Sequence, residues 1–349
     1  MEKNGATMYI VYLDLLGTKE SSKDAEVYSQ LIEKFSKAVM DTAWNLKNSG
    51  KVGMFSDSVY AESSDLKNLL DFLVQLRFRL FSESIFFNAV VKKGDLNTKN
   101  ISNGSHFYGT VFSGKDIASL YNAQVSFKGI GIFVDKSIEK EAIEEVGYHL
   151  NDSVFIQYNK DDKNIQKKYY PVRYKDISFL DTINYNCIQD KLFTTVLNMM
   201  YSSYLQSPKY GRYYISVITN LLRSNIEGFI WNKAQQTFSK APTSFALIFK
   251  MLSKYYSKLC DFPGVEFLTF ILLDIIYMSD LDTDAKEDIT KQFTNIDFIQ
   301  NKYVHFLEEI PDSLFTIQEG SISSNRERFI QYCKKDLSRS FVNDLLNDE

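Results

Sequence analysis

Residues 9–17 are YIVYLDLLG and residues 54–60 are MFSDSVY, and these two stretches decide the expected fold. Each places one aspartate, Asp14 or Asp57, at the edge of an apolar run that is typical of a buried strand. Two carboxylates on adjacent strands repel each other unless a cation lies between them. A pair of Mg²⁺ or Mn²⁺ ions that carries a triphosphate is the usual occupant, so the sequence predicts a two-metal nucleotide site.

The elements around these aspartates follow an order that strengthens the prediction. Helical and strand-like periodicities predict, in chain order, a strand over 8–16, a helix over 25–46, a hairpin over 51–63, a helix over 66–82 and a strand over 85–91. The first helix is expected to have Ser21 or Ser22 as its N-cap. This order is that of a ferredoxin-like βαββαβ fold, which brings Asp14 and Asp57 together at one edge of the sheet.

The rest of the chain is expected to form two further parts. Residues 136–145 have a helical pattern, and residues 147–158 and 169–179 resemble two strands of an added β-hairpin that extends the sheet or covers its edge. From about residue 182, long apolar-periodic segments broken by prolines predict an all-helical C-terminal region, with helices over 191–205, 213–222, 244–259 and 265–278. The expected fold class is therefore α+β, with a catalytic domain over residues 1–180 and a helical domain over residues 181–349.

Five short motifs resemble those of class III nucleotide cyclase domains. They are YLDLLG at 12–17, FSDS at 55–58, Lys93-Gly94, GKDIASLY at 114–121 and GIGIFV at 129–134, within the first 135 residues or so. The chain is most similar to the pyrimidine cyclases of bacterial Pycsar anti-phage systems. That resemblance implies a cyclase or palm domain that makes cyclic CMP or cyclic UMP and pyrophosphate from CTP or UTP during infection. It also implies a separate effector that the cyclic nucleotide activates.

The resemblance carries roles over to particular residues. It implies that Asp14 and Asp57, with Leu15, hold two Mg²⁺ or Mn²⁺ ions, and that the amides of Leu15, Leu16 and Gly17 hold the phosphates. The hydroxyls of Ser56 or Ser58 are expected to position phosphates. Lys93 or Lys115 is expected to offset developing negative charge, and Lys51, Gly53 and Phe55 are the candidates for reading the base.

Other residues depart from the family's pattern. The later glycine expected after Lys93-Gly94 is replaced near Lys99, and the Asn and Arg of purine cyclases fall on Ala118 and Asn122. These departures fit a pyrimidine cyclase better than an adenylate or guanylate cyclase, which is the main alternative. A degenerate cyclase fold that binds a nucleotide or a partner also stays open, as does a polymerase-type palm. A single aspartate or glycine at these positions also fits an ordinary turn.

The resemblance further implies a homodimer with sites across the interface. The helical region is then expected to fix the dimer or to sense a phage-derived trigger. With 44% hydrophobic residues, a net charge of −4 and no leader or membrane segment, the chain is expected to be cytoplasmic, without nucleic acid or membrane partners. Its three widely spaced cysteines predict neither a disulfide framework nor a zinc site.

Overall fold

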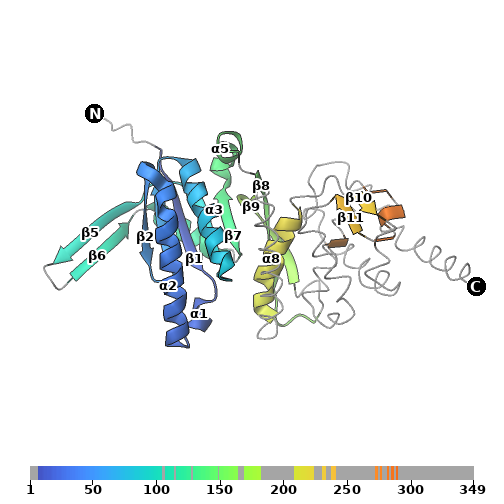
Figure 1. Cartoon of the computed structure of the whole chain (residues 1–349), viewed down its shortest axis with the longest axis horizontal. Helices are drawn as coiled ribbons and strands as arrows, with labels where there is room; N and C mark the ends of the chain where they lie inside the picture. Colours follow the sequence, from blue (N-terminus) through green and yellow to red (C-terminus); the bar gives the residue numbers. More distant parts are fainter. Residues whose placement is uncertain are drawn as a thin grey trace, which may run out of the picture. The chain divides into compact units, whose positions relative to one another are not determined.

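The computed structural model describes residues 7–103, 107–113, 115–126, 129–147, 149–163, 169–181, 208–223, 230–232, 237–240 and a few positions between 272 and 289 (Figure 1). The chain divides into two compact units. One comprises Met1–Phe155 and Tyr174–Tyr201, and the other comprises Ile156–Arg173 and Ser202–Glu349. The domain boundary expected after residue 180 stays a prediction.

The first unit begins with the expected order of elements. These are β1 (Tyr9–Leu15), α1 (Thr18–Ser21), α2 (Ala25–Thr42), the 3₁₀-helix η1 (Ala43–Ser49), β2 (Gly50–Phe55), β3 (Ser58–Ser63), α3 (Leu66–Ser82) and β4 (Phe87–Lys93). The next elements are β5 (Asn97–Asn103), β6 (Phe107–Ser113), α4 (Lys115–Ser126), β7 (Gly131–Asp135), η2 (Lys136–Ile138), α5 (Glu139–Glu144), β8 (His149–Tyr158) and β9 (Tyr169–Asp181). The α+β class is confirmed.

The strands form a mixed sheet in the order β2-β3-β1-β4-β7-β9-β8. β1 lies between β3 and β4 and is antiparallel to both, whereas β4 and β7 are parallel. The first four strands in this order are those of a ferredoxin-like βαββαβ unit, as predicted. β8 and β9 extend the same sheet, so the added hairpin continues it.

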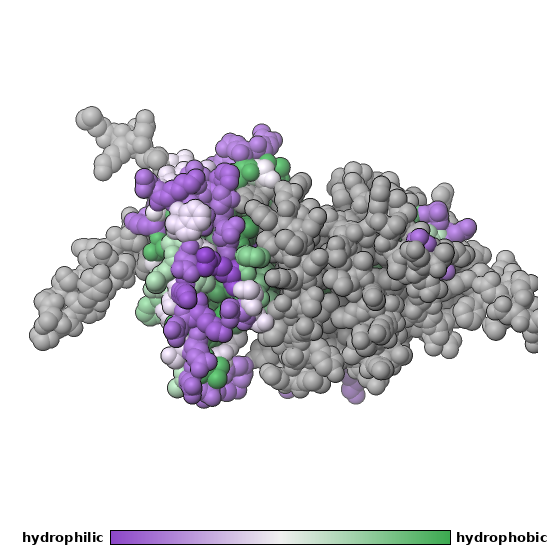
Figure 2. Space-filling view, viewed as in Figure 1, coloured by the Kyte–Doolittle hydropathy of each residue, from purple (hydrophilic) through white to green (hydrophobic). Residues whose placement is uncertain are grey.

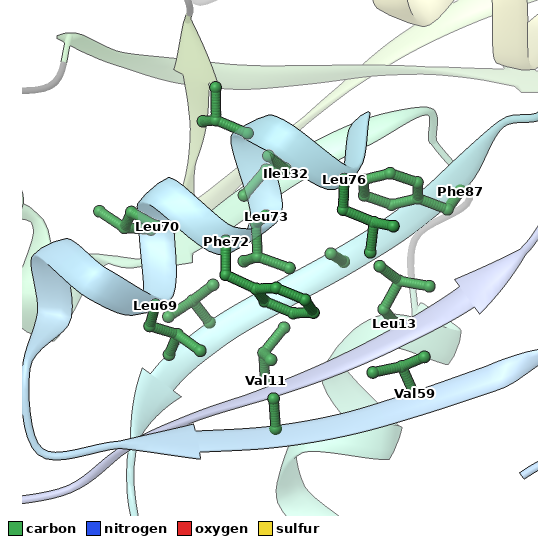
Figure 3. Packing of buried hydrophobic residues seen from close by; sticks show 14 of the residues in the cluster. Val11, Leu13, Val59, Leu69, Leu70, Phe72, Leu73, Leu76, Phe87 and Ile132 are labelled. Carbon is green, nitrogen blue, oxygen red and sulfur yellow. The ribbon is translucent and has the colours of Figure 1, made fainter. Parts of the chain in front are cut away.

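One face of the sheet is covered by α2 and α3. Alternate residues of β1 point to opposite faces, and Val11, Leu13 and Leu15 are buried in one apolar cluster with both helices. Figure 3 shows the α3 side chains, among them Phe72 and Leu76, packed against residues of β1, β3 and β4. The outward surface of α2 is mainly hydrophilic, as an amphipathic helix requires (Figure 2).

α4 lies on the opposite face of the sheet. Tyr121 of α4 contacts Tyr12 of β1 with ring centroids 5.8 Å apart, and Lys92 of β4 donates to Ser119 of α4 at 2.8 Å. Tyr12 and Lys92 alternate along their strands with the core residues Val11 and Val91. The face that carries Tyr12 therefore also carries Asp14, which is half-buried.

Three local features differ from the sequence-based expectations. The N-cap of α2 is Asp24, whose carboxylate accepts hydrogen bonds from the amides of Glu26 and Val27; Ser21 instead ends the short helix α1. The helix predicted over 25–46 ends at Thr42 and continues as η1. The hairpin β5–β6, which projects as a separate two-stranded sheet, was not expected because NTKNISN at 97–103 lacks alternating apolar residues (Figure 1).

The C-terminal region is helical in part. α8 (Pro208–Arg223) contains the predicted segment 213–222 and starts at a proline, which suits the first position of a helix. β10 (Ile230–Asn232) and β11 (Thr237–Lys240) pair as a hairpin, so the region is not helical throughout. The helices predicted over 191–205 and 244–259, and most of 265–278, lie outside the described residues. None of the helices described combines the length and apolar content needed to cross a membrane.

Candidate functional site

The register of four strands places one row of side chains on the α4 face of the sheet. Phe55 of β2 is opposite Ser58 of β3, Ser58 is opposite Asp14 of β1, and Asp14 is opposite Asn88 of β4. Asn88 is fully buried, Asp14 and Ser58 are half-buried, and Phe55 is 75% exposed. This row runs from a buried amide to an exposed aromatic ring, with the Asp14 carboxylate near its centre.

Asp57 lies beside this row in the two-residue turn between β2 and β3. The amide of Leu15 donates to the Asp57 carbonyl at 3.0 Å, so the peptide that follows Asp14 contacts the peptide of Asp57. Ser56, the first turn residue, has φ 54°, a left-handed conformation typical of tight hairpins. The structure therefore brings Asp14 and Asp57 together as predicted, whereas their role as metal ligands stays a prediction.

Ser58 connects Asp14 to Tyr12. Its hydroxyl donates to Asp14 Oδ1 at 3.0 Å and lies 3.1 Å from the Tyr12 phenol oxygen. Tyr12 also packs against Tyr60, with ring centroids 4.8 Å apart. The Ser58 hydroxyl was expected to position a phosphate; in the structure it donates to the Asp14 carboxylate.

Burial is the main cause of raised pKa values in this tyrosine cluster. It raises the pKa of Tyr12 to about 12; the Ser58 hydrogen bond lowers this pKa, and the nearby Asp14 carboxylate makes a smaller contribution that raises it. Burial likewise raises the pKa of Tyr60, with further contributions from Tyr121 and Asp14. Tyr12 and Tyr60 therefore stay neutral at physiological pH and can donate hydrogen bonds.

The loop after Asp14 is more tightly bound than a phosphate loop requires. The amides of Leu15 and Leu16 donate to the Asp57 and Phe86 carbonyls at 3.0 and 2.9 Å. Both amides are therefore used within the chain, and their role as phosphate donors stays a prediction. Gly17 has φ 84° and precedes α1, so the prediction for its amide stays open.

The structure does not bring Lys93 to the aspartates of its own chain. Lys93 is opposite Tyr9, five residues along β1 from Asp14, which corresponds to about 16 Å. There it forms an ion pair with Glu141 of α5, and the Tyr9 phenol donates to the same carboxylate at 2.7 Å. In this chain the Lys93 side chain therefore joins β4 to α5, and its charge-offsetting role stays a prediction.

This contact predicts a pH dependence of stability. Hydrogen bonds from Lys93 and then Tyr9 lower the pKa of Glu141 below its ordinary value. A carboxyl whose pKa is lowered by folding stabilises the protein above its unfolded pKa, near 4.3, and loses that contribution as pH falls through the folded value. We expect Glu141→Gln to cost less than about 1 kcal/mol at pH 7, and this difference from wild type to vanish toward pH 3.

Urea unfolding at several pH values measures this difference. Glu144→Gln is the matched control, since Glu144 is an exposed residue of the same helix whose carboxylate lies 3.7 Å from Lys140. A Glu141→Gln penalty that stays constant from pH 7 to pH 3 would contradict the assignment.

The other predicted site residues, Lys115, Ser56 and Lys51, lie at different places in the first unit. Lys115 is exposed at the start of α4, where the neighbouring Asp116 accepts a hydrogen bond from the Asp95 amide at 3.2 Å. Lys115 is thus at the Lys93 end of the sheet, away from the aspartates. Ser56 Oγ lies 2.8 Å from the Tyr28 phenol oxygen, and Lys51 forms an ion pair with Glu62 at 2.7 Å.

Sequence reasoning missed the residues that surround Asp14. Tyr12, Tyr60, Asn88 and Tyr121 were not predicted to belong to the site. A signal was present, because Tyr12 is two positions before Asp14 and Tyr60 is two after Ser58, and residues two apart on a strand share a face. Placing Asn88 beside Asp14 requires the register between β1 and β4, which the sequence pattern does not supply.

The donors at this end of the sheet suit a hard divalent cation. Carboxylate oxygens are preferred ligands of Mg²⁺ and Mn²⁺, and Asp14 and Asp57 come from adjacent backbone positions. Within the described residues, no group of three or more His, Cys, Asp or Glu side chains is close enough to hold a metal ion. Mg²⁺ commonly uses one or two carboxylates together with substrate phosphates, so a two-carboxylate site fits that ion.

No protein-family model and no curated protein matches the chain. Among solved structures, it is similar to the guanylate cyclase domain of RhGC from Catenaria anguillulae in complex with GTP (9% identity, 50% of this chain, 96% of that chain, TM-score 0.36). It is also similar to the adenylyl cyclase CyaB from P. aeruginosa (12% identity, 50% and 93%, TM-score 0.34). Adenylate cyclases from Trypanosoma brucei give 9% identity, 52% and 91% coverage and a TM-score of 0.37. Likeness at this level carries no argument about function, which depends on the site itself.

Proposed function

We propose that this protein is a nucleotide cyclase that converts CTP or UTP to a 3′,5′-cyclic pyrimidine monophosphate and pyrophosphate. The observation that carries the proposal is the backbone hydrogen bond that brings the segment of Asp14 beside that of Asp57. The two residues lie at one end of a β2-β3-β1-β4 sheet, joined through the hydrogen bond from the Leu15 amide to the Asp57 carbonyl. Two carboxylates, one on β1 and one in the adjoining β2–β3 turn, suit a pair of divalent cations with a triphosphate.

The chain's own residues would hold and orient the substrate. Asp14 and Asp57 supply carboxylate ligands, and Ser58 fixes the Asp14 carboxylate through the 3.0 Å hydrogen bond. Bound divalent cations would lower the pKa of the ribose 3′-hydroxyl and offset the charge of the triphosphate. Gly17 is the remaining candidate for an amide contact to phosphate, because the Leu15 and Leu16 amides are already used.

A homodimer is part of the proposal. Lys93 and Lys115 lie at the far end of the sheet from Asp14, and Lys51 is paired with Glu62. We propose that a second copy of the chain supplies further positive charge to the triphosphate. The α4 face of the sheet is where we place that copy.

Phe55 is our candidate for contact with the base. Its ring is 75% exposed, in the same register row as Ser58 and Asp14. Stacking of a base on an aromatic ring contributes about 1–3 kcal/mol. We expect Phe55→Ala to raise the KM for the nucleotide roughly tenfold with a smaller effect on kcat, measured by initial rates over a range of substrate concentrations. Trp44→Ala, which removes a 70% exposed ring from η1, is the control and is expected to leave KM unchanged.

The choice of a pyrimidine base rests on Ala118 and Asn122, which stand where purine cyclases have Asn and Arg. Both are exposed on α4 in the structure. A role in anti-phage signalling, with a separate effector that the cyclic nucleotide activates and a phage-derived trigger, follows from the resemblance to Pycsar cyclases. A purine cyclase is the alternative within the same reaction class.

The test is to incubate the purified chain with Mn²⁺ and each of ATP, GTP, CTP and UTP, and to identify products by mass. A cyclic pyrimidine monophosphate that is absent with Asp57→Ala supports the proposal and names the base. A cyclic purine product would replace it with the alternative. If no triphosphate is cyclised, with or without a lysate of phage-infected cells, the protein is a binding module and not a cyclase.

A further inference from the structure

The hydroxyl of Ser58 takes part in two hydrogen bonds at the centre of the candidate site. It donates to Asp14 Oδ1 at 3.0 Å and lies 3.1 Å from the Tyr12 phenol oxygen. A serine hydroxyl has one proton, and here that proton is given to the carboxylate. Tyr12 must therefore be the donor in the second hydrogen bond. Tyr12 donates to Ser58, and Ser58 donates to Asp14.

The Tyr12 phenol, the first donor in this pair of hydrogen bonds, is itself held in place by packing. Tyr12 is 6% exposed, and its ring contacts Tyr60 of β3 at 4.8 Å and Tyr121 of α4 at 5.8 Å between centroids. A phenol carries a proton at neutral pH and can donate it in a hydrogen bond. The orientation of the Ser58 hydroxyl is thus fixed by Tyr12, whose ring is packed against Tyr60 and Tyr121 on the α4 face of the sheet.

An aspartate side chain can rotate about its terminal bond, and a hydrogen bond to one oxygen limits that rotation. In metal sites, residues that bond to the ligands orient them, and their replacement commonly lowers metal affinity 10–100-fold. We propose that Ser58, oriented by Tyr12, is a positioning residue that holds the Asp14 carboxylate in the direction in which it binds a divalent cation. This inference rests on the proposed function.

The test measures Mn²⁺ binding to the full-length, nucleotide-free protein by the electron paramagnetic resonance signal of the free ion. The informative pair is Ser58→Thr and Ser58→Val, because threonine and valine have nearly the same shape and differ in the hydroxyl. We expect Ser58→Val to weaken Mn²⁺ binding 10–100-fold and Ser58→Thr to stay close to wild type. Tyr12→Phe, which leaves the Ser58 hydroxyl free to turn, is expected to weaken binding several-fold.

Ser36→Ala is the matched control, since the Ser36 hydroxyl donates only locally, to the Glu33 carbonyl of its own helix at 2.9 Å. Circular dichroism confirms that each variant is folded. In turnover assays, a positioning role shifts the Mn²⁺ concentration needed for half-maximal rate, and saturating Mn²⁺ restores most of kcat in Ser58→Val. A general structural defect would not be rescued by metal.

The outcomes separate this inference from the function that it rests on. If Asp14→Asn and Asp57→Asn abolish Mn²⁺ binding while Ser58→Thr and Ser58→Val bind equally, the positioning role is wrong and the metal site stands. If the aspartate variants bind Mn²⁺ like wild type, the assignment of the metal site to Asp14 and Asp57 is wrong, and so is the positioning role of Ser58. Loss in Ser58→Val alone, with Ser58→Thr retained, supports the inference.

Discussion

Replacing Asp57 with asparagine is expected to lower the rate of cyclic nucleotide formation at least about 100-fold, which corresponds to about 3 kcal/mol of lost transition-state stabilisation. Asparagine keeps the shape of the side chain but removes the negative charge that a divalent cation requires. The backbone contact from the Leu15 amide to the Asp57 carbonyl does not involve the side chain, so the turn is expected to stay folded. The measurement is the initial rate at saturating Mn²⁺ with the triphosphate that wild type uses.

Asp65→Asn is the matched control for this prediction. Asp65 is the N-cap of α3, where its carboxylate accepts from the Asn68 amide at 3.0 Å, and asparagine caps helices about as well. Ser58 is the first residue of β3, whereas Asp65 comes just after its last residue, so Asp65 lies at the end of β3 away from the candidate site. Equal rates for Asp57→Asn and Asp65→Asn would remove Asp57 from the mechanism.

Replacing Phe72 with alanine is expected to destabilise the first unit by about 3–5 kcal/mol. Phe72 is 0% exposed and lies between α3 and the strands, in contact with the apolar cluster that contains Val11 and Leu13 (Figure 3). Truncation removes buried apolar surface and leaves a cavity that rigid neighbours fill only in part. The melting midpoint, followed by circular dichroism, is expected to fall by roughly 10 °C.

Phe78→Ala provides the comparison within the same helix. Phe78 is 39% exposed, so its loss removes much less buried surface and is expected to cost less than about 1 kcal/mol. Similar midpoints for Phe72→Ala and Phe78→Ala would contradict the placement of Phe72 in the core. Any loss of activity in Phe72→Ala is expected to follow from the loss of stability, because Phe72 lies on the face of the sheet opposite Asp14.

The sequence predicts the fold well where apolar residues are periodic. The helix over 66–82 matches α3 at both ends, and the hairpin over 51–63 matches β2 and β3. α1 was not expected, because four residues without a side-chain cap leave no pattern. β5 was not expected, because its residues are polar and belong to a separate two-stranded sheet.

The candidate site is predicted in part. The juxtaposition of Asp14 and Asp57 follows from strand order alone, since β1 must lie beside the β2–β3 turn in this topology. The distance of Lys93 from Asp14 was not predictable, because a motif does not say at which end of a strand it lies. β4 runs antiparallel to β1, so the residue near the end of β4 meets the start of β1. The partners of each amide and hydroxyl likewise depend on register, which one sequence does not supply.

The loop that follows Asp14 is held from both sides, by the Leu15 amide on the Asp57 carbonyl and the Leu16 amide on the Phe86 carbonyl. These amides are expected to be among the slowest in the chain to exchange with deuterium, since they open only when the central strands separate. A site built on such a loop needs little ordering when its ligand arrives. Heating should then abolish catalysis and melt the sheet in one step, without a folded but inactive state between them.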